Sequence, residues 1–443
     1  MSIPLNDMSF ANNTSATGSV EERDASYSQD AFTAPAEVSD YKHLAGKRVG
    51  LVVLSSYPWD PRPRRAAEAL VQQGMSVDFI CLTDGKAPWR EKSNGMNIFR
   101  IPITRRRGGL FAYAYEYSAF ILASAAILAA RSLRHRYDLI YVNNMPDILV
   151  VSALFPKMLG AKVILDQHDP MPELMATIFN SPPTSKRLRL IKWLEKWSLK
   201  RADQVLTPNI ACKRIFGARS CPSEKLSVVM NTPDENIFHY RSAQQSMVLG
   251  NKSDRPFVLM YHGSLVERNG ADLAVEAFAS IRSKLPLKAQ LHIYGKATPF
   301  LEQVMGSVRD LGLQDCVLYK GQQPLENIVK GINACDVGLI PNQRSAFADI
   351  NTPTRIFEYL SLGRPVIVPR TPGIQDYFPQ DSIFFFEVGS ASDLAKQIAF
   401  VASHPKEVLS VTERGQQVYR AHSWKQEKHA LVSLVDKLLS FNG

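Results

Sequence analysis

The sequence INTPTRIFEYLSLGRPVIV, residues 350–368, joins a predicted helix to a predicted strand. Apolar residues at 356–360 follow the helical period up to Gly363, and the β-branched residues at 366–368 predict a buried strand. Glu358 lies within the apolar run, although a carboxylate is seldom buried unless a partner holds it. Because the start of a helix favours negative charge, a half-buried Glu358 is tolerated there, which raises the question of what it binds.

The same alternation of strand and helix extends along the chain in two series. Strands of the first series are predicted at 47–56, 76–82, 137–144, 161–169, 202–209 and 224–231, with helices at about 64–74 and 147–160. In the second series, strands are predicted at 256–264, 289–296, 316–321, 337–342 and 364–369, with helices at 270–285, 299–312, 325–335 and 354–363. This spacing predicts an α/β fold with two Rossmann-like domains, each a doubly wound parallel sheet.

The chain divides at changes of composition. Residues 1–46 are polar and acidic and predict a disordered tail, and 47–241 form the first domain. A polar stretch without periodicity, 242–254, predicts a linker before the second domain at 255–422. The amphipathic helix within 423–443 is expected to cross back to the first domain. Two such domains place a central cleft between the carboxyl ends of both sheets, where ligands bind.

Composition limits the classes of function. With 45% hydrophobic and 21% charged residues in 443, the chain is an ordinary globular protein. The net charge is +10, of which residues 1–46 contribute −5, so the remainder carries +15. This excess suits phosphorylated ligands or an anionic membrane surface, or it is only a basic solvent shell.

Five cysteines without a CxxC pair predict buried thiols in a reducing cytosol and no zinc site, and no signal peptide is evident. We therefore expect a cytoplasmic protein. No GxGxxG follows a predicted strand, which argues against a dinucleotide-dependent dehydrogenase, and no Walker A sequence occurs.

Several motifs occur in the order typical of one family. The second half contains YHGSLVERNGADLAVEAF, YKGQQPLENIVKGINACDVGLIP and PTRIFEYLSLGRPVIV. It resembles the donor-binding half of the family 4 retaining glycosyltransferases, which have the GT-B fold. The first half contains DPRPRRAAEALVQQG, ILDQHDPMPEL and EKWSLKRADQVLTPN. It is similar to the acceptor-side domain of bacterial, polysaccharide-type members, and the resemblance extends from Lys47 to the end.

The resemblance implies that Glu358 accepts hydrogen bonds from the ribose hydroxyls of a sugar nucleotide. Two vicinal hydroxyls are donors and an ionised carboxylate only accepts, so the pairing is physically sound. The alternative is a structural ion pair with Arg355 or Arg364. The family carries a further acid eight residues earlier, where this chain has Ile350. Either backbone amides of the 349–354 loop or a flanking residue, Asp349 or Asn351, would contact the sugar instead.

A diphosphate leaving group requires positive charge nearby. Arg268 lies in the loop after the strand that ends at His262, and the resemblance makes it a phosphate ligand together with Arg355. The family's arginine and lysine in this loop are replaced by Ser264 and Asn269. Alternatively, Arg268 is a solvated loop charge. The remaining predicted donor-binding residues are Gly263, Ser264, Asn351 and Thr354.

His168 follows a predicted strand at the edge that faces the cleft. The matching family histidine lies near the donor sugar and assists transfer; the alternative is a structural histidine. Asp166 and Asp169 are expected to be loop and capping residues. Arg62 and Arg64 are expected to face the acceptor or the phosphates, or else solvent.

The segment 104–136 contains a charge-free run of 14 residues, 117–130, which is short of the ~20 needed to span a bilayer. Its six flanking arginines favour contact with anionic lipid, and the alternative is a helix packed in the core. The basic helix at 185–201, with Trp193 and Trp197 on one face, presents the same two possibilities.

We therefore predict a retaining glycosyltransferase with catalytic residues His168, Arg268 and Glu358. Its donor is a nucleoside-diphosphate sugar, used as a co-substrate with no other cofactor and no metal. Its acceptor is a lipid-linked or glycan intermediate of cell-envelope polysaccharide or glycolipid synthesis, at the cytoplasmic face of the membrane. No nucleic-acid partner is expected. The alternatives are a non-hydrolysing sugar-nucleotide epimerase and a non-catalytic nucleotide-sugar-binding protein.

Overall fold

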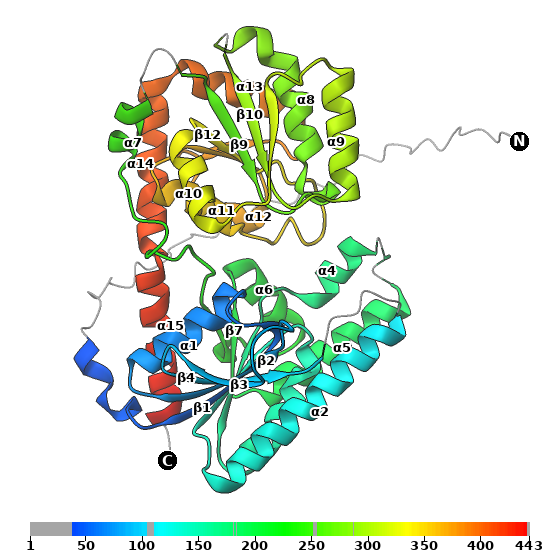
Figure 1. The fold of residues 1–443 in the computed structure, drawn as a ribbon, viewed down its shortest axis with the longest axis vertical. Coiled ribbons are helices and arrows are strands. Elements are labelled where there is room, and N and C mark those ends of the chain that lie inside the picture. Colours follow the sequence, from blue (N-terminus) through cyan, green and yellow to red (C-terminus); the bar gives the residue numbers. More distant parts are fainter. Residues whose placement is uncertain are drawn as a thin grey trace, which may run out of the picture. The chain divides into compact units, whose positions relative to one another are not determined.

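A computed structural model of the chain describes residues 38–103, 110–179, 181–182, 184–250, 255–286 and 288–440. It contains an eight-stranded sheet of order β3-β4-β2-β1-β5-β6-β7-β8 and a six-stranded sheet of order β11-β10-β9-β12-β13-β14 (Figure 1). All strand pairs are parallel except β3 with β4. The predicted α/β class with two parallel-sheet domains is confirmed. We call 38–241 together with the last helix the first lobe, and 242–421 the second lobe.

The strands have the following bounds. The first sheet consists of β1 Arg48–Ser56, β2 Ser76–Leu82, β3 Arg90–Ser93, β4 Met96–Ile101, β5 Leu139–Asn143, β6 Lys162–Asp166, β7 Gln204–Thr207 and β8 Leu226–Val228. The second consists of β9 Val258–His262, β10 Gln290–Tyr294, β11 Val317–Gly321, β12 Val337–Leu339, β13 Val366–Pro369 and β14 Phe384–Phe386.

The helices alternate with these strands. In the first lobe they are η1 Val38–Leu44, α1 Pro61–Gln72, α2 Leu110–Arg134, η2 Asp147–Ala153, α3 Leu154–Met158, α4 Met171–Ile178, α5 Lys186–Arg201, α6 Ile210–Arg219, η3 Ser223–Lys225 and α15 Trp424–Ser440. The second lobe has α7 Ala243–Gly250, η4 Glu267–Asn269, α8 Ala271–Ile281, η5 Arg282–Lys284, α9 Pro299–Asp310, α10 Leu325–Ala334, α11 Thr354–Ser361, α12 Pro372–Gln375, α13 Ala391–Ser403 and α14 Pro405–Ala421.

Helices cover both faces of the first sheet, which explains its apolar strands. Along β1, Leu51 and Val53 join one hydrophobic cluster, whereas Val52 and Leu54 join another. Successive side chains of a strand point to opposite faces, so both faces of β1 are buried. The edge pair β3–β4 was not predicted. Its turn at Asn94-Gly95 has positive φ at both residues, as a two-residue hairpin turn requires.

The predictions of a disordered tail at 1–46 and of a linker without regular structure at 242–254 are partly wrong. In the supposed tail, 38–44 form η1, and Leu44 is buried in a cluster that includes residues of α15; residues 1–37 lie outside the described part of the chain. In the supposed linker, 243–250 form α7; residues 251–254 lie outside the described part. There Ser246 Oγ donates to the carbonyl of Leu362 at 2.7 Å. Both segments are ordered by distant contacts, which local composition does not reveal.

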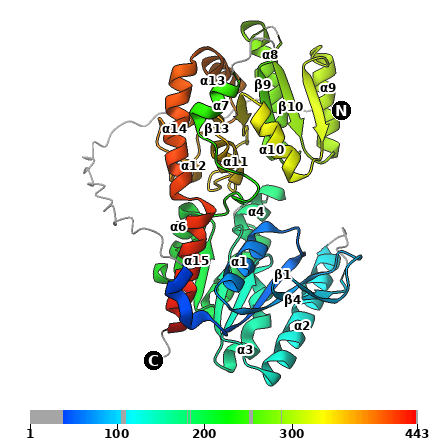
Figure 2. The same ribbon diagram turned by 60° about the vertical axis from the view of Figure 1, so that its left-hand side comes forward.

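The last two helices pack on different lobes. Helix α14 lies against α11 and α7 of the second lobe. Helix α15 lies beside α1 of the first lobe (Figure 2), where Leu431, Val432 and Val435 are buried with residues of β1 and α1. The chain therefore returns to the first lobe between Ala421 and Trp424.

Helix α2 packs on the first sheet with one side only. Phe120 and Leu128 are buried in a cluster with β5 residues, whereas Leu122 and Leu133 are exposed. Its segment Tyr115–Arg134 has the length and composition of a membrane span. The flanking arginines at 105–107 lie outside the described residues.

Removing buried atoms from α15 should destabilise the first lobe. Leu431 is 1% exposed, so Leu431→Ala should lower the free energy of unfolding by about 2–5 kcal/mol, measured by urea denaturation. Lys437→Ala on the exposed side of the same helix should change it by less than about 0.5 kcal/mol. Equal effects of the two substitutions would show that the packing of α15 does not stabilise the lobe.

Candidate active site

A cavity of about 360 Å³ lies at the carboxyl ends of both sheets. The first lobe contributes His168, Asp169, Pro208, Met230 and Asn231. The second lobe contributes Gly263, Ser264, Asn269, Asn342, Asn351, Thr352, Pro353, Thr354 and Arg355. Ligands bind α/β sheets at this edge, so the cavity is the candidate site.

Six of the predicted site residues line this cavity: His168, Gly263, Ser264, Asn351, Thr354 and Arg355. Arg268 and Glu358 do not line it. Arg268 lies close enough for its charge to act on Asp169 of the cavity wall: burial raises the pKa of that carboxyl, and His168, Arg62 and Arg268 oppose the rise. Arg268 is therefore near the cavity without forming its surface.

Glu358 is held by a histidine that the sequence interpretation did not use. Its Oε2 lies 2.6 Å from Nε2 of His262, the last residue of β9, and its side chain is 16% exposed. A carboxylate only accepts hydrogen bonds, so Nε2 carries the hydrogen. The other ring nitrogen, Nδ1, lies 2.8 Å from the hydroxyl of Tyr359. The signal in the sequence was a polar His262 closing an apolar strand.

Among the described residues, neither Arg355 nor Arg364 pairs with Glu358. The alternative of a structural ion pair with one of these arginines is therefore wrong. Arg355 donates from Nη1 to the carbonyl of His262 at 2.6 Å, and from Nη2 to Oδ1 of Asn342 at 3.1 Å. Arg364 instead donates to the carbonyl of Asn333.

Arg355 extends across the end of β9 because residue 263 is glycine. A Cβ at Gly263 would lie 2.9 Å from Nη1 of Arg355, and the φ of +138° at Gly263 also disfavours a side chain. The guanidinium thus lies against the backbone at the cavity wall. Its position is fixed by two hydrogen bonds, so it presents a stationary positive charge to any ligand there.

Ile350, which replaces an acid of the family motif, does not line the cavity. Its side chain packs against the hydrophobic core of the first lobe, and its carbonyl accepts from Nδ2 of Asn209 at 2.9 Å. The preceding Asp349 lies 3.5 Å from Arg344. Asn351, the next residue, lines the cavity. Ile350 is thus a contact between the two lobes, and a carboxylate here would be buried against apolar side chains.

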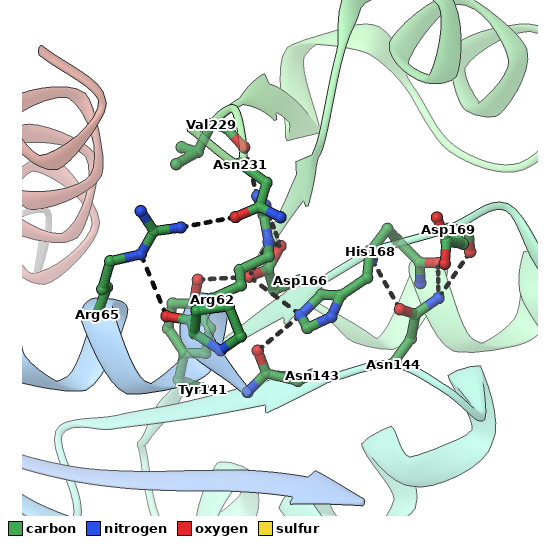
Figure 3. A network of polar contacts seen from close by, with 12 residues as sticks. Arg62, Arg65, Tyr141, Asn143, Asn144, Asp166, His168, Asp169, Val229 and Asn231 are labelled. Carbon is green, nitrogen blue, oxygen red and sulfur yellow. Dashed lines mark hydrogen bonds and ion pairs between the residues drawn. The ribbon is translucent and has the colours of Figure 1, made fainter. Parts of the chain in front are cut away.

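His168 is fixed by two asparagines (Figure 3). Its backbone N–H donates to Asn144 Oδ1 at 2.7 Å, and its Nε2 lies 3.1 Å from Asn143 Oδ1. Because Asn143 Nδ2 donates to the carbonyl of Val52, its oxygen faces the histidine and Nε2 carries the hydrogen. Burial lowers the pKa of His168. The charge of Asp166 opposes this lowering, whereas the charge of Arg62 adds to it. The ring is therefore neutral near pH 7.

Beneath His168 lies a buried ion pair that corrects two predictions. Arg62 does not face acceptor, phosphate or solvent; its Nη2 and Nε lie 2.6 and 3.0 Å from the carboxylate of Asp166, and its Nη1 donates to the carbonyl of Val229 (Figure 3). Asp166 is no loop or capping residue but the buried end of β6. Burial raises its pKa, but Arg62, His168 and the hydroxyl of Tyr141 together outweigh burial, and the pKa falls below its usual value. Removing one partner of such a pair costs about 3–5 kcal/mol.

Two further predictions have mixed outcomes. Arg64 lies 3.5 Å from Asp234 and does not line the cavity. Asp169 lies in the loop between β6 and α4, as expected, but it is not the cap of α4, because Pro170 occupies that position, and it lines the cavity.

Among the described residues, no group of three or more His, Cys, Asp or Glu side chains is arranged to hold a metal ion. All five cysteines are buried and free.

Two family models match the sequence. Residues 60–232 match the model for a glycosyl transferase 4-like domain, and residues 244–418 match that for glycosyl transferases group 1. Sulfoquinovosyl transferase SQD2 of Arabidopsis thaliana is 22% identical over 293 residues, 64% of this chain and 53% of that protein. Amylovoran biosynthesis glycosyltransferase AmsK of Erwinia amylovora is 24% identical over 197 residues, 44% and 46% respectively. The matches thus span about half the length of these relatives.

Solved structures share the fold. Sucrose-phosphate synthase from Thermosynechococcus elongatus superposes with a TM-score of 0.71 at 20% identity, covering 89% of this chain and 99% of that one. Anabaena HepE in complex with UDP-glucose gives 0.64 at 13% identity, covering 88% and 98%. These similarities support the GT-B arrangement of two Rossmann-like domains.

The network around His168 should make stability depend on pH. Asp147 accepts from Asn144 Nδ2 at 3.0 Å, and burial, helped by the charge of Glu195, raises its pKa to about 7. In the unfolded chain the pKa is about 3.9. Between these values the folded state binds a proton that the unfolded state lacks, so this contribution to stability falls as pH rises from about 4 to about 7.

We therefore expect Asp147→Asn, which stays neutral, to be more stable than the parent above pH 7 by about 1–4 kcal/mol. Below about pH 4, where this carboxyl is protonated in both the folded and the unfolded state, the difference should be small. Urea unfolding across this range checks it, with Asp310→Asn on the surface as control. Parallel curves for the parent and Asp147→Asn would contradict the assignment.

Proposed function

Because the chain belongs to the glycosyl transferases group 1 family, with the GT-B fold, we propose that it transfers a sugar from a nucleoside-diphosphate donor to a hydroxyl acceptor. The single observation that carries the proposal is the cavity at the ends of both sheets, with Arg355 on one side and His168 on the other. Retention of anomeric configuration is proposed from the family resemblance.

The second lobe would hold the diphosphate. Arg355 already uses two N–H groups on the protein, and a guanidinium has five, so donors remain for phosphate oxygens. Gly263 leaves room for the Arg355 guanidinium at the end of β9, and the hydroxyl of Ser264, which also lines the cavity, can donate to phosphate as well. With Arg268 near Asp169, two arginines would neutralise the charge that grows on the departing diphosphate. On this ground we propose transfer without a metal ion.

Glu358 would bind the ribose, with His262 as its positioning residue. The bond of 2.6 Å from His262 engages Oε2. None of the described residues donates a hydrogen bond to Oε1, which can therefore accept from the 2′- and 3′-hydroxyls. For the ribose to reach it, the nucleoside would lie beyond the cavity lining, on the side of Gly263 and β9.

His168 would contact the donor sugar from the first lobe. As a neutral ring with its hydrogen on Nε2, it offers Nδ1 as an acceptor for a sugar hydroxyl. In the transfer, the bond from the anomeric carbon to the diphosphate oxygen breaks and the bond to the acceptor oxygen forms. The acceptor proton leaves to the departing oxygen, which becomes more basic as its bond breaks. Asn351 would replace the missing acid as a sugar contact.

The acceptor is proposed to be a lipid-linked or glycan intermediate of cell-envelope polysaccharide or glycolipid synthesis, at the cytoplasmic face of the membrane. The names of the two curated relatives, which describe sulfoquinovosyl transfer and amylovoran biosynthesis, support an acceptor of this kind.

Incubating the protein with radiolabelled sugar nucleotides and a membrane extract tests the reaction. Transfer of label into lipid or polymer is the expected result. Interconversion of the free donor would indicate an epimerase instead, and binding without turnover would indicate a non-catalytic nucleotide-sugar-binding protein.

His168→Ala should lower kcat by about 100-fold or more while nucleotide affinity, measured by calorimetry, stays within about twofold. An unchanged kcat would remove His168 from the mechanism.

The role of Glu358 is tested by nucleotide binding alone. Hydrogen bonds to a charged group contribute about 1.5–3 kcal/mol, so Glu358→Ala should weaken the best-binding nucleoside diphosphate of a panel by about 10- to 150-fold. The parent should prefer the ribonucleotide over its 2′-deoxy form, and the variant should bind both alike. Glu302→Ala, exposed on α9, is the control. A variant that still discriminates the two sugars would refute the ribose assignment.

A further inference from the structure

Helix α5 presents a strongly basic exposed face. Its exposed charged residues are Lys186, Arg187, Arg189, Lys192, Lys196, Lys200 and Arg201. The single acid of the helix, Glu195, is buried and accepts from Arg219 at 2.6 Å. Nothing acidic on α5, all of which the structure describes, therefore offsets these seven positive charges. An excess of this kind on one helix attracts a polyanionic surface.

Large apolar side chains stand exposed among these charges. Leu190 is 56% and Trp193 58% exposed, three residues apart on one side of α5. At the end of α4, Ile178 is 48% and Phe179 54% exposed. The guanidinium of Arg187 lies 5.3 Å above the ring of Phe179, which joins the two groups into one surface. We call these four apolar residues and the seven basic ones the α4–α5 face.

We propose that the α4–α5 face docks on an anionic lipid bilayer. Tryptophan and aliphatic side chains surrounded by lysine and arginine are typical of helices that lie in the membrane interface. Protein interfaces are depleted in lysine at their core, which makes a protein partner a poorer fit. Nucleic-acid bases stack on aromatic rings such as Trp193 and Phe179, but Leu190 and Ile178 offer them nothing, whereas a bilayer accommodates all four apolar side chains.

The α4–α5 face fits this partner better than α2 does. Helix α2 also exposes apolar residues, such as Leu122 and Leu133, but Arg131 at its end is bonded to Asp78 at 2.7 Å. Because that arginine is engaged inside the lobe, less positive charge remains on α2 for lipid headgroups. Both helices pack against η2, so the two surfaces belong to one side of the first lobe.

Docking there would bring the membrane close to the cavity. Helix α4 begins two residues after Asp169 of the cavity wall and ends at Ile178, a length of about 12 Å for its eight residues. The same helix contacts the second lobe, where the N–H of Phe347 donates to Thr177 Oγ1. This step rests on the proposed function: a membrane docked on the α4–α5 face delivers a lipid-linked acceptor to the His168 side of the cavity.

Vesicle flotation with the full chain tests the proposal without any enzyme assay. The parent should float with vesicles containing about one-third phosphatidylglycerol and not with pure phosphatidylcholine, and high salt should weaken binding. Lys192→Glu with Lys196→Glu should lower the partition coefficient at least about tenfold, and Trp193→Ala should lower it as well. The matched control is Lys396→Glu with Lys406→Glu, two exposed lysines of the second lobe, which should bind like the parent.

Each other outcome overturns the proposal. These are equal binding to neutral vesicles, unchanged binding of the Lys192→Glu/Lys196→Glu variant, a shift of a dimer to a monomer in Trp193→Ala, and tight binding of an oligonucleotide lost in the same charge variant. Circular dichroism and nucleoside-diphosphate binding of each variant show that its fold and cavity are intact. Loss of vesicle binding with retained nucleotide binding separates a failure of docking from a failure of the proposed function.

Discussion

The buried ion pair between Arg62 and Asp166 fixes the edge of the first sheet on which the candidate site is built. It joins α1 to the end of β6, and its remaining hydrogen bonds reach Tyr141 on β5 and the carbonyl of Val229 after β8. A charge pair out of contact with water requires this complete set of partners. The backbone that leaves β6 is therefore held firmly, and His168 follows only two residues later.

A second fixed point lies across the cavity, on the other sheet. His262 at the end of β9 holds two side chains of α11: its ring binds Glu358, and its carbonyl binds Arg355. Because hydrogen bonds restrain both side chains before any ligand arrives, little conformational entropy is lost when a ligand binds. The site is thus prepared from two rigid sheet edges, with the contact of Ile350 on the first lobe between them.

What the sequence analysis missed depends on how far apart in the sequence the interacting residues lie. Glu358 became a candidate because an acid interrupts a helical apolar run, and His168 because it follows a strand; both signals are local. The partner of Glu358 was wrong because His262 is 96 residues away, and sequence proximity favoured Arg355 and Arg364. The sequence analysis also predicted that Arg62 faces a ligand or solvent, because its partner Asp166 lies 104 residues further along the chain. Pairing at such distances depends on how the strands are ordered, which periodicity does not specify.

By itself, the sequence determined the two parallel sheets and the edge at which the candidate site lies, since hydrophobic periodicity and the order of elements are properties of neighbouring residues. Only the tertiary structure decided which charged groups are buried and with what partners. It placed Ile350 between the lobes, ordered 38–44 and 243–250, and left the α4–α5 face exposed. The reason is that burial depends on elements far apart in the chain, and burial determines whether an ionised side chain needs a partner.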